Sequence, residues 1–278
     1  MPINTTRSWA RVIDDYRDIP LFFKEPFAAF SLSCAEPPYA VFAPPDRSFS
    51  RKQNARIICV SGDEIRIYEK HRKQLICTAF PIRGIQYIET GSILLYSWIK
   101  ISGMAGDRLD SVTWTFNTST EPILKPVIDK ARRLKTPAGA DASFDSLLPL
   151  GYKYANMAKS AVSPAENALQ VLTQPEIKEP RFRILGKTFY RTLLPSAVVI
   201  LTARELILLS VNTDKSVKAG GTKRFIPLDK IMDVSVAPAG RGLIRCTLRL
   251  PGAENIEIGL EYGRLDELNA MLEGLRPA

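Results

Sequence analysis

The chain has 278 residues, of which 45% are hydrophobic and 24% charged. This globular composition excludes a collagen-like, disordered or disulfide-scaffold protein, and the length is sufficient for two domains. The net charge of +9 favours anionic partners such as lipid headgroups, nucleic acid or acidic peptides. A soluble basic protein without an anionic ligand is the simpler interpretation, and the charge alone does not exclude it.

Cysteine use and hydropathy predict a cytoplasmic protein. The four cysteines have no C-x-x-C spacing, and Cys59, Cys77 and Cys246 lie in apolar, strand-like runs. Free cysteines in such runs are expected to pack as small hydrophobic residues in a reducing compartment. The apolar stretch 193–203 is far shorter than the roughly 18 residues that a membrane span needs. The first 18 residues contain no signal-peptide core.

The N-terminal segment, residues 1–37, predicts a short helix from Thr6 or Ser8 to about Tyr16, followed by an aromatic-rich run over 21–30. Such a run is expected to pack on the neighbouring domain. The alternative is an interfacial membrane patch, for which Phe22-Phe23-Lys24 has a suitable composition.

Residues 38–136 predict seven antiparallel strands followed by one amphipathic helix. Apolar and polar residues alternate, or β-branched residues gather, in each strand run. The runs are 39–43, 56–61, 64–70, 75–81, 85–90, 93–102 and 111–117. Apolar residues then recur at helical spacing over 123–134, with Thr120 available as an N-cap. Pro126 falls within the first turns of this helix and makes its start less certain.

Residues 137–177 predict a connector that contains helices. A stretch of small residues at 136–143 has the composition of a linker. Residues 144–162 are expected to form a helix, and Ser163-Pro164 is expected to start a second one that continues to about Leu172.

Residues 178–278 predict the same order of elements again. The strand runs are 182–185, 194–201, 205–212, 222–228, 231–236, 243–250 and 255–261, and the closing helix spans about 264–275. Blocks of the two halves match in the same order: 60–68 matches 201–209, and 80–85 matches 226–231. A repeat of whole strand-and-helix units indicates a tandem duplication.

The fold class is therefore α+β and mainly β. A strand, turn and strand over 199–209, followed by Phe225-Ile-Pro-Leu-Asp-Lys-Ile231, resembles the pleckstrin-homology-like (PH-like) superfold, including its GRAM-like and bacterial members; 79–85 is the counterpart in the first copy. The resemblance implies two tandem PH-like domains, 38–136 and 178–278, each a bent sheet or barrel with a C-terminal capping helix. A helical connector would join them.

Two basic clusters lie between the first two predicted strands of the copies. They comprise Arg47, Arg51, Lys52 and Arg56 in the first copy, and Arg181, Arg183, Lys187 and Arg191 in the second. The resemblance implies that this loop can bind phosphorylated headgroups, and Lys and Arg side chains that converge from a hairpin can hold a polyanion. The alternative is a solvated basic loop.

Catalytic signatures are absent from the sequence. The single histidine, His71, lies in a charged stretch that predicts a solvated loop, and no nucleophile-elbow, P-loop or zincin motif is present. Acidic residues and cysteines are too sparse to predict a metal site, and no cofactor is predicted. We therefore expect that the protein is not an enzyme.

These observations predict a non-catalytic binding or scaffolding module that docks a protein partner. The alternative is peripheral binding to anionic membrane lipids through the two basic clusters, with the protein cytoplasmic in both cases. Nucleic acid is disfavoured because few aromatic residues are interleaved with the basic ones. The sequence leaves the oligomeric state open.

Overall fold

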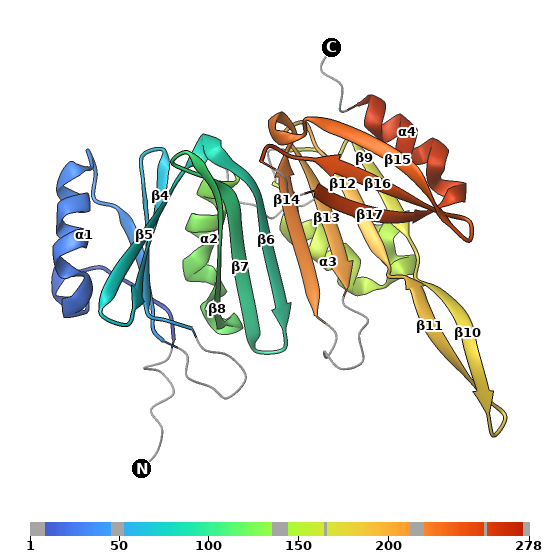
Figure 1. Cartoon of the computed structure of the whole chain (residues 1–278), viewed down its shortest axis with the longest axis horizontal. Helices are drawn as coiled ribbons and strands as arrows, with labels where there is room; N and C mark the ends of the chain where they lie inside the picture. The colour runs from blue at the N-terminus through green and yellow to red at the C-terminus, as the bar shows by residue number, and fades with distance from the viewer. Residues whose placement is uncertain are drawn as a thin grey trace. The chain divides into compact units, whose positions relative to one another are not determined.

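A computed structural model describes residues 9–45, 53–134, 144–163, 166–211, 220–252 and 255–274. The chain divides into two compact units, Met1–Lys135 and Thr136–Ala278. Each is described by itself. The protein is a mainly-β α+β protein with several antiparallel sheets, and its helices follow groups of strands (Figure 1).

The first unit begins with five antiparallel strands in sequential order. They are β1 (Arg11–Val12), β2 (Tyr39–Ala43), β3 (Arg56–Ser61), β4 (Glu64–His71) and β5 (Gln74–Pro81). The predicted strands from 39 to 81 are confirmed within one residue at each end. The register of β3 on β4 places Ser61 opposite Glu64, so the two residues Gly62-Asp63 form the turn, with Gly62 at a φ of 53°.

Three longer strands and a helix complete the first unit. They are β6 (Ile85–Ile93), β7 (Tyr96–Ala105), β8 (Arg108–Asn117) and α2 (Glu121–Ala131). Gly103 of β7 allows a close approach between backbones, because a Cβ atom there would lie 2.5 Å from the carbonyl oxygen of Gly84. Helix α2 buries Leu124, Val127 and Ala131, as its apolar spacing predicts.

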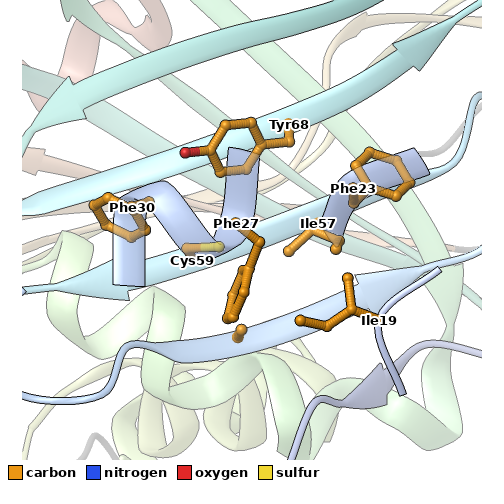
Figure 2. Close-up of a cluster of buried hydrophobic side chains, with 8 residues drawn as sticks. Ile19, Phe23, Phe27, Phe30, Ile57, Cys59 and Tyr68 are labelled. Atoms are coloured by element: carbon orange, nitrogen blue, oxygen red, sulfur yellow. The ribbon is translucent and has the colours of Figure 1, made fainter. Parts of the chain in front are cut away.

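Helix α1 (Leu21–Ser33) covers one face of the five-stranded sheet (Figure 2). Phe23, Phe27 and Phe30 are buried in a cluster with Ile57 and other residues of the sheet. Because α1 lies on one face and the unit's interior on the other, β3 is buried at four consecutive positions, as is typical of a strand covered on both sides.

The second unit contains α3 (Tyr152–Ala161) and a four-stranded antiparallel arrangement. Its strands are β9 (Gln170–Gln174), β12 (Ala197–Leu201), β13 (Glu205–Val211) and β14 (Gly221–Pro227), with β12 between β9 and β13. The strands β15 (Asp233–Gly240), β16 (Leu243–Arg249) and β17 (Asn255–Glu261) form a separate three-stranded sheet, and α4 (Leu265–Glu273) follows it.

Strands β10 (Ile177–Ile184) and β11 (Lys187–Leu194) lie between β9 and β12 in the chain and pair only with each other among the described strands. They form a two-stranded hairpin that extends away from the other strands of the second unit (Figure 1). Short 3-10 helices occur at Tyr16–Asp18, Ile82–Gly84, Thr118–Thr120, Asp145–Leu150, Leu228–Lys230 and Tyr262–Arg264.

Four expectations require correction. Residues 21–33 form the N-terminal helix, whereas the predicted helix to Tyr16 is replaced by β1 and a 3-10 turn. The predicted helix over 144–162 is interrupted at Gly151, whose φ of 115° breaks it into a 3-10 helix and α3. Residues 170–174 form β9 rather than the end of a helix, so the second sheet begins inside the predicted connector. Cys77 is exposed on β5 rather than buried.

The described strands form open sheets, and no closed barrel is found among them. Among the described helices, none is both long enough and apolar enough to cross a membrane.

Candidate binding surface

The first predicted basic cluster is only partly described. Arg47, Arg51 and Lys52 lie outside the described residues. Arg56 is on β3, and its guanidinium is held within the fold: Nη2 lies 2.6 Å from Glu69 Oε2, and Nη1 donates to the carbonyl oxygen of Thr113 at 2.5 Å. Only 12% of the Arg56 side chain is exposed. This geometry does not support Arg56 as a headgroup ligand.

Replacing Arg56 by alanine is expected to lower the free energy of unfolding by about 1–3 kcal/mol, because a half-buried carboxylate at Glu69 loses its charged partner. Urea-induced unfolding measures this effect. Arg181→Ala is the matched control, because its side chain is exposed and a substitution at such a site changes stability by less than about 0.5 kcal/mol. Equal stability of the two variants would contradict the structural role of Arg56.

The second cluster lies on the β10–β11 hairpin. The register places Ile184 opposite Lys187 and Phe182 opposite Phe189. Leu185 and Gly186 form the two-residue turn with φ values of 48° and 77°, the combination that type I′ hairpin turns require. A bulge between Pro180 and Phe182 interrupts the pairing. The segment predicted as one strand at 182–185 is therefore the end of β10 and the first residue of its turn.

The hairpin exposes nearly all of its side chains. Every residue from 181 to 191 is exposed, including Ile184 at 54%, Leu185 at 97% and Tyr190 at 62%. The rings of Phe182 and Phe189 stack on each other with centroids 4.8 Å apart. Exposed aromatic and aliphatic residues thus accompany the basic ones.

The four predicted basic residues of the hairpin differ in their contacts. Within the described part of the chain, the side chains of Arg181, Arg183 and Lys187 make no ion pair or hydrogen bond. Arg191 instead donates to Glu179 Oε1 at 2.6 Å. Arg181, Arg183 and Lys187 are therefore available to an external partner. Arg191 belongs to the root of the hairpin, its base, where β10 and β11 join the rest of the second unit.

The root is fixed to the rest of the second unit. Glu179 accepts hydrogen bonds from Arg191 and also from Arg241, which lies in the β15–β16 turn, with Arg241 Nη1 at 2.6 Å from Oε1. Leu194 at the end of β11 is buried, and a Cβ atom at Gly259 of β17 would lie 2.4 Å from its Cδ1 atom. Glu179 and Leu194 therefore tie the base of the hairpin to the three-stranded sheet.

Replacing Glu179 by glutamine is expected to loosen the hairpin. Burial acts to raise the pKa of Glu179, but the hydrogen bonds from Arg241 and Arg191 outweigh it, and the net pKa lies below the usual 4.5. A lowered pKa stabilises the fold above pH 4.5 and loses that effect as the pH falls through the folded value. In the wild type the hairpin should therefore loosen only in acid, whereas Glu179→Gln loosens it at neutral pH.

Amide hydrogen exchange of residues 177–194 measures this loosening as lower protection factors. Glu257→Gln is the matched control, because Glu257 pairs with Arg245 on β16 and β17, and its carboxylate makes no contact with the hairpin. Unchanged protection in Glu179→Gln at neutral pH would contradict the role of this carboxylate.

Other polar groups of the described residues offer little chemistry. No group of three or more metal-ligating side chains is found in the described ranges. Burial raises the pKa of the Cys59 thiol, and raises that of Cys246 to about 11, so both are protonated and poorly nucleophilic at neutral pH. His71 is exposed at the end of β4.

A cavity of about 190 Å³ lies in the first unit, with Ala43, Gln53 and Tyr96 among its lining residues. The Gln53 amide is occupied, since its Nε2 donates to the Thr115 carbonyl oxygen and its Oε1 accepts from the Thr115 amide. Both polar atoms of the Gln53 amide are thus bound to β8 rather than directed at a ligand.

Comparisons with known proteins add no family: no protein-family model matches the chain, and no curated protein is similar to it. Sequence reasoning identified the basic residues of the hairpin but not Ile184, Leu185, Phe189 and Tyr190 as part of the same surface. For Ile184 the only signal is the short alternation with Phe182 before Gly186, which also fits a buried strand.

Proposed function

We propose that the protein is a non-catalytic binding and scaffolding module built from two PH-like domains, and that the β10–β11 hairpin is its docking element. The order of elements supports the PH-like assignment. In each unit a sequential group of antiparallel strands is followed by a three-stranded group, β6–β8 or β15–β17, and then by a helix, α2 or α4.

One observation carries the docking proposal: the β10–β11 hairpin, which lies in the chain between β9 and β12 of the second unit, is exposed along its whole outer part. An isolated two-stranded hairpin is marginally stable in water. Contiguous exposed apolar residues rimmed by polar ones are typical of an interaction site. A hairpin fixed at its root and exposed at its tip is suited to reaching a partner, whether a protein or an anionic surface.

In-cell photo-crosslinking tests this proposal and requires no assumption about the identity of the partner. A photoreactive amino acid at Leu185 is expected to give adducts with another macromolecule, protein or lipid, because this side chain is 97% exposed at the tip. The matched control carries the same group at Met232, which is 67% exposed in the same unit but lies outside the hairpin. Equal or absent adducts at the two positions would refute docking through the hairpin.

A further inference from the structure

The tip of the β10–β11 hairpin combines aliphatic exposure with positive charge. Leu185 is 97% exposed and Ile184 is 54% exposed, although both are side chains that the fold would ordinarily bury. Arg183 precedes Ile184 and Lys187 is opposite it; both cations are exposed and make no ion pair or hydrogen bond within the described residues. No contact within the described part of the second unit accounts for this arrangement.

The charge of the hairpin selects the kind of partner. Residues 177–194 contain five basic side chains and one acidic one, which is a net charge of +4. The acidic residue, Glu179, is already bound by Arg191 and Arg241. A second copy of the hairpin would bring like charges together, whereas an anionic surface complements them.

The placement of the charges on the two faces excludes a single convergent ligand site. Residues that pair across a hairpin share a face, and neighbours along a strand alternate. Lys187 therefore lies on the face of Ile184, Phe182 and Phe189, while Arg183, opposite Thr188, lies on the other face. Cations on both faces cannot close around one headgroup, but they can meet many headgroups that surround the hairpin.

We infer that the β10–β11 hairpin inserts tip first into an anionic membrane interface, with Ile184 and Leu185 at the acyl boundary and Arg183 and Lys187 among the lipid phosphates. The inference rests on the proposed function and names its partner. Lys187 is opposite Ile184 and Arg183 is the residue before Ile184, so both cations lie beside the aliphatic tip. Amphipathic elements at membrane interfaces bury their apolar side about 5–10 Å deep, and long Lys and Arg side chains can reach back from there to the phosphates, because their apolar stems lie along apolar surface while the charged ends stay in water.

The aliphatic character of the tip favours a membrane over a nucleic acid. Bases bind by stacking on exposed aromatic faces, but the outermost side chains of the hairpin, Ile184 and Leu185, are aliphatic. Its exposed aromatic residues, Phe182, Phe189 and Tyr190, lie farther from the tip. An acidic protein could bind to the same cations. Binding to protein-free vesicles distinguishes a membrane partner from such a protein.

The experiment uses the full chain with phosphatidylcholine vesicles that contain or lack phosphatidylserine. In Ile184→Trp, tryptophan replaces an exposed strand residue, for which it is well suited. We expect a blue shift of the added fluorescence and its quenching by acyl-brominated lipids, in the anionic vesicles only. The emission of the wild type, from its own three tryptophans, is subtracted.

Leu185→Asn removes the more exposed of the two aliphatic side chains of the tip without weakening the turn. Asparagine followed by Gly186 is the preferred type I′ sequence, so a loss of binding cannot be attributed to an unfolded hairpin. Co-sedimentation should weaken about thirty-fold, the effect of removing one leucine from an apolar environment. Leu94→Asn is the matched control, because Leu94 also has a positive φ, 53°, in a strand turn and is 68% exposed.

The outcomes separate the inference from the proposed function. Anionic vesicle binding with quenching, and with a loss in Leu185→Asn but not in Leu94→Asn, supports insertion. Binding without quenching, or equal loss in both asparagine variants, overturns insertion but leaves docking intact. No vesicle binding together with protein or nucleic-acid adducts at position 185 overturns the membrane partner alone, and neither vesicle binding nor adducts overturns both.

Discussion

Replacing Trp114 by alanine is expected to lower the free energy of unfolding by about 3–5 kcal/mol, the usual cost of removing a fully buried large aromatic side chain. Trp114 lies on β8 opposite Ile99 of β7, and its side chain is fully buried in the first unit. The cavity left by the indole cannot collapse easily, because β8 is held to β7 along its whole length. Guanidinium-induced unfolding measures the loss.

Trp114→Phe is the matched control for this prediction. Among the residues that the structure describes, the buried indole Nε1 has no hydrogen-bond partner, so phenylalanine removes an unsatisfied donor while it keeps much of the apolar volume. We expect a loss of less than about 1.5 kcal/mol for this variant. If alanine proved no more destabilising than phenylalanine, the interior of the first unit would not depend on this side chain.

Strand positions in both units were largely predictable from sequence. The runs at 39–43 and 56–61 became β2 and β3 without change, and the last predicted strand, 255–261, became β17. These runs succeed because their alternation or β-branching agrees with burial on the faces of a sheet. The repeat added support, because the same pattern occurred twice in the same order.

Two elements were mispredicted because their structure depends on distant partners. Ser163-Pro164 is a strong local signal for a helix start, yet residues 170–174 pair with β12 as β9, so tertiary pairing prevailed. In the N-terminal segment, Phe23, Phe27 and Phe30 have helical spacing, but Pro26 within the same run disfavours a helix locally. Burial of the three rings against the sheet stabilises α1 nonetheless.

The candidate surface was predicted only in its charges. The two-residue turn contains Leu185 where asparagine or aspartate is usual, so the sequence gives no clear hairpin signal and β11 was missed. Alternation in a short strand also does not distinguish a buried face from one that faces solvent. Ile184 and Leu185 are exposed because β10 and β11 lie between β9 and β12 in the chain but pair only with each other among the described strands. Local sequence patterns do not encode this pairing.

Of the predicted cations that the structure describes, Arg56 and Arg191 are held in ion pairs, whereas Arg181, Arg183 and Lys187 are open. The predicted cations that the described structure leaves without an ion pair therefore lie on the outer part of the β10–β11 hairpin. Charge reversal of the three cations without an ion pair therefore tests the membrane contact more specifically than a change in net charge does.

Reversing Arg181, Arg183 and Lys187 to glutamate is expected to weaken binding to anionic vesicles by more than about a thousand-fold. Each lysine or arginine near an anionic bilayer contributes about 1 kcal/mol, and each reversal replaces this attraction by a comparable repulsion. The three side chains are exposed and make no ion pair or hydrogen bond within the described residues, so the fold should be retained. Co-sedimentation at about 50 and 200 mM salt, a range over which exposed charges are progressively screened, measures the loss.

The matched control reverses Arg72, Lys73 and Arg83, which are exposed in the β4–β5 turn and in the 3-10 helix Ile82–Gly84 of the first unit. Three reversals of two charges each lower the net charge from +9 to +3 in both variants. If binding depended only on the field of the whole protein, the two variants would lose it equally. Tip-first insertion requires the hairpin variant to lose far more, because its cations lie on the element that contacts the membrane and two of them, Arg183 and Lys187, adjoin Ile184. Equal losses would place the contact elsewhere and refute the assignment of these three residues.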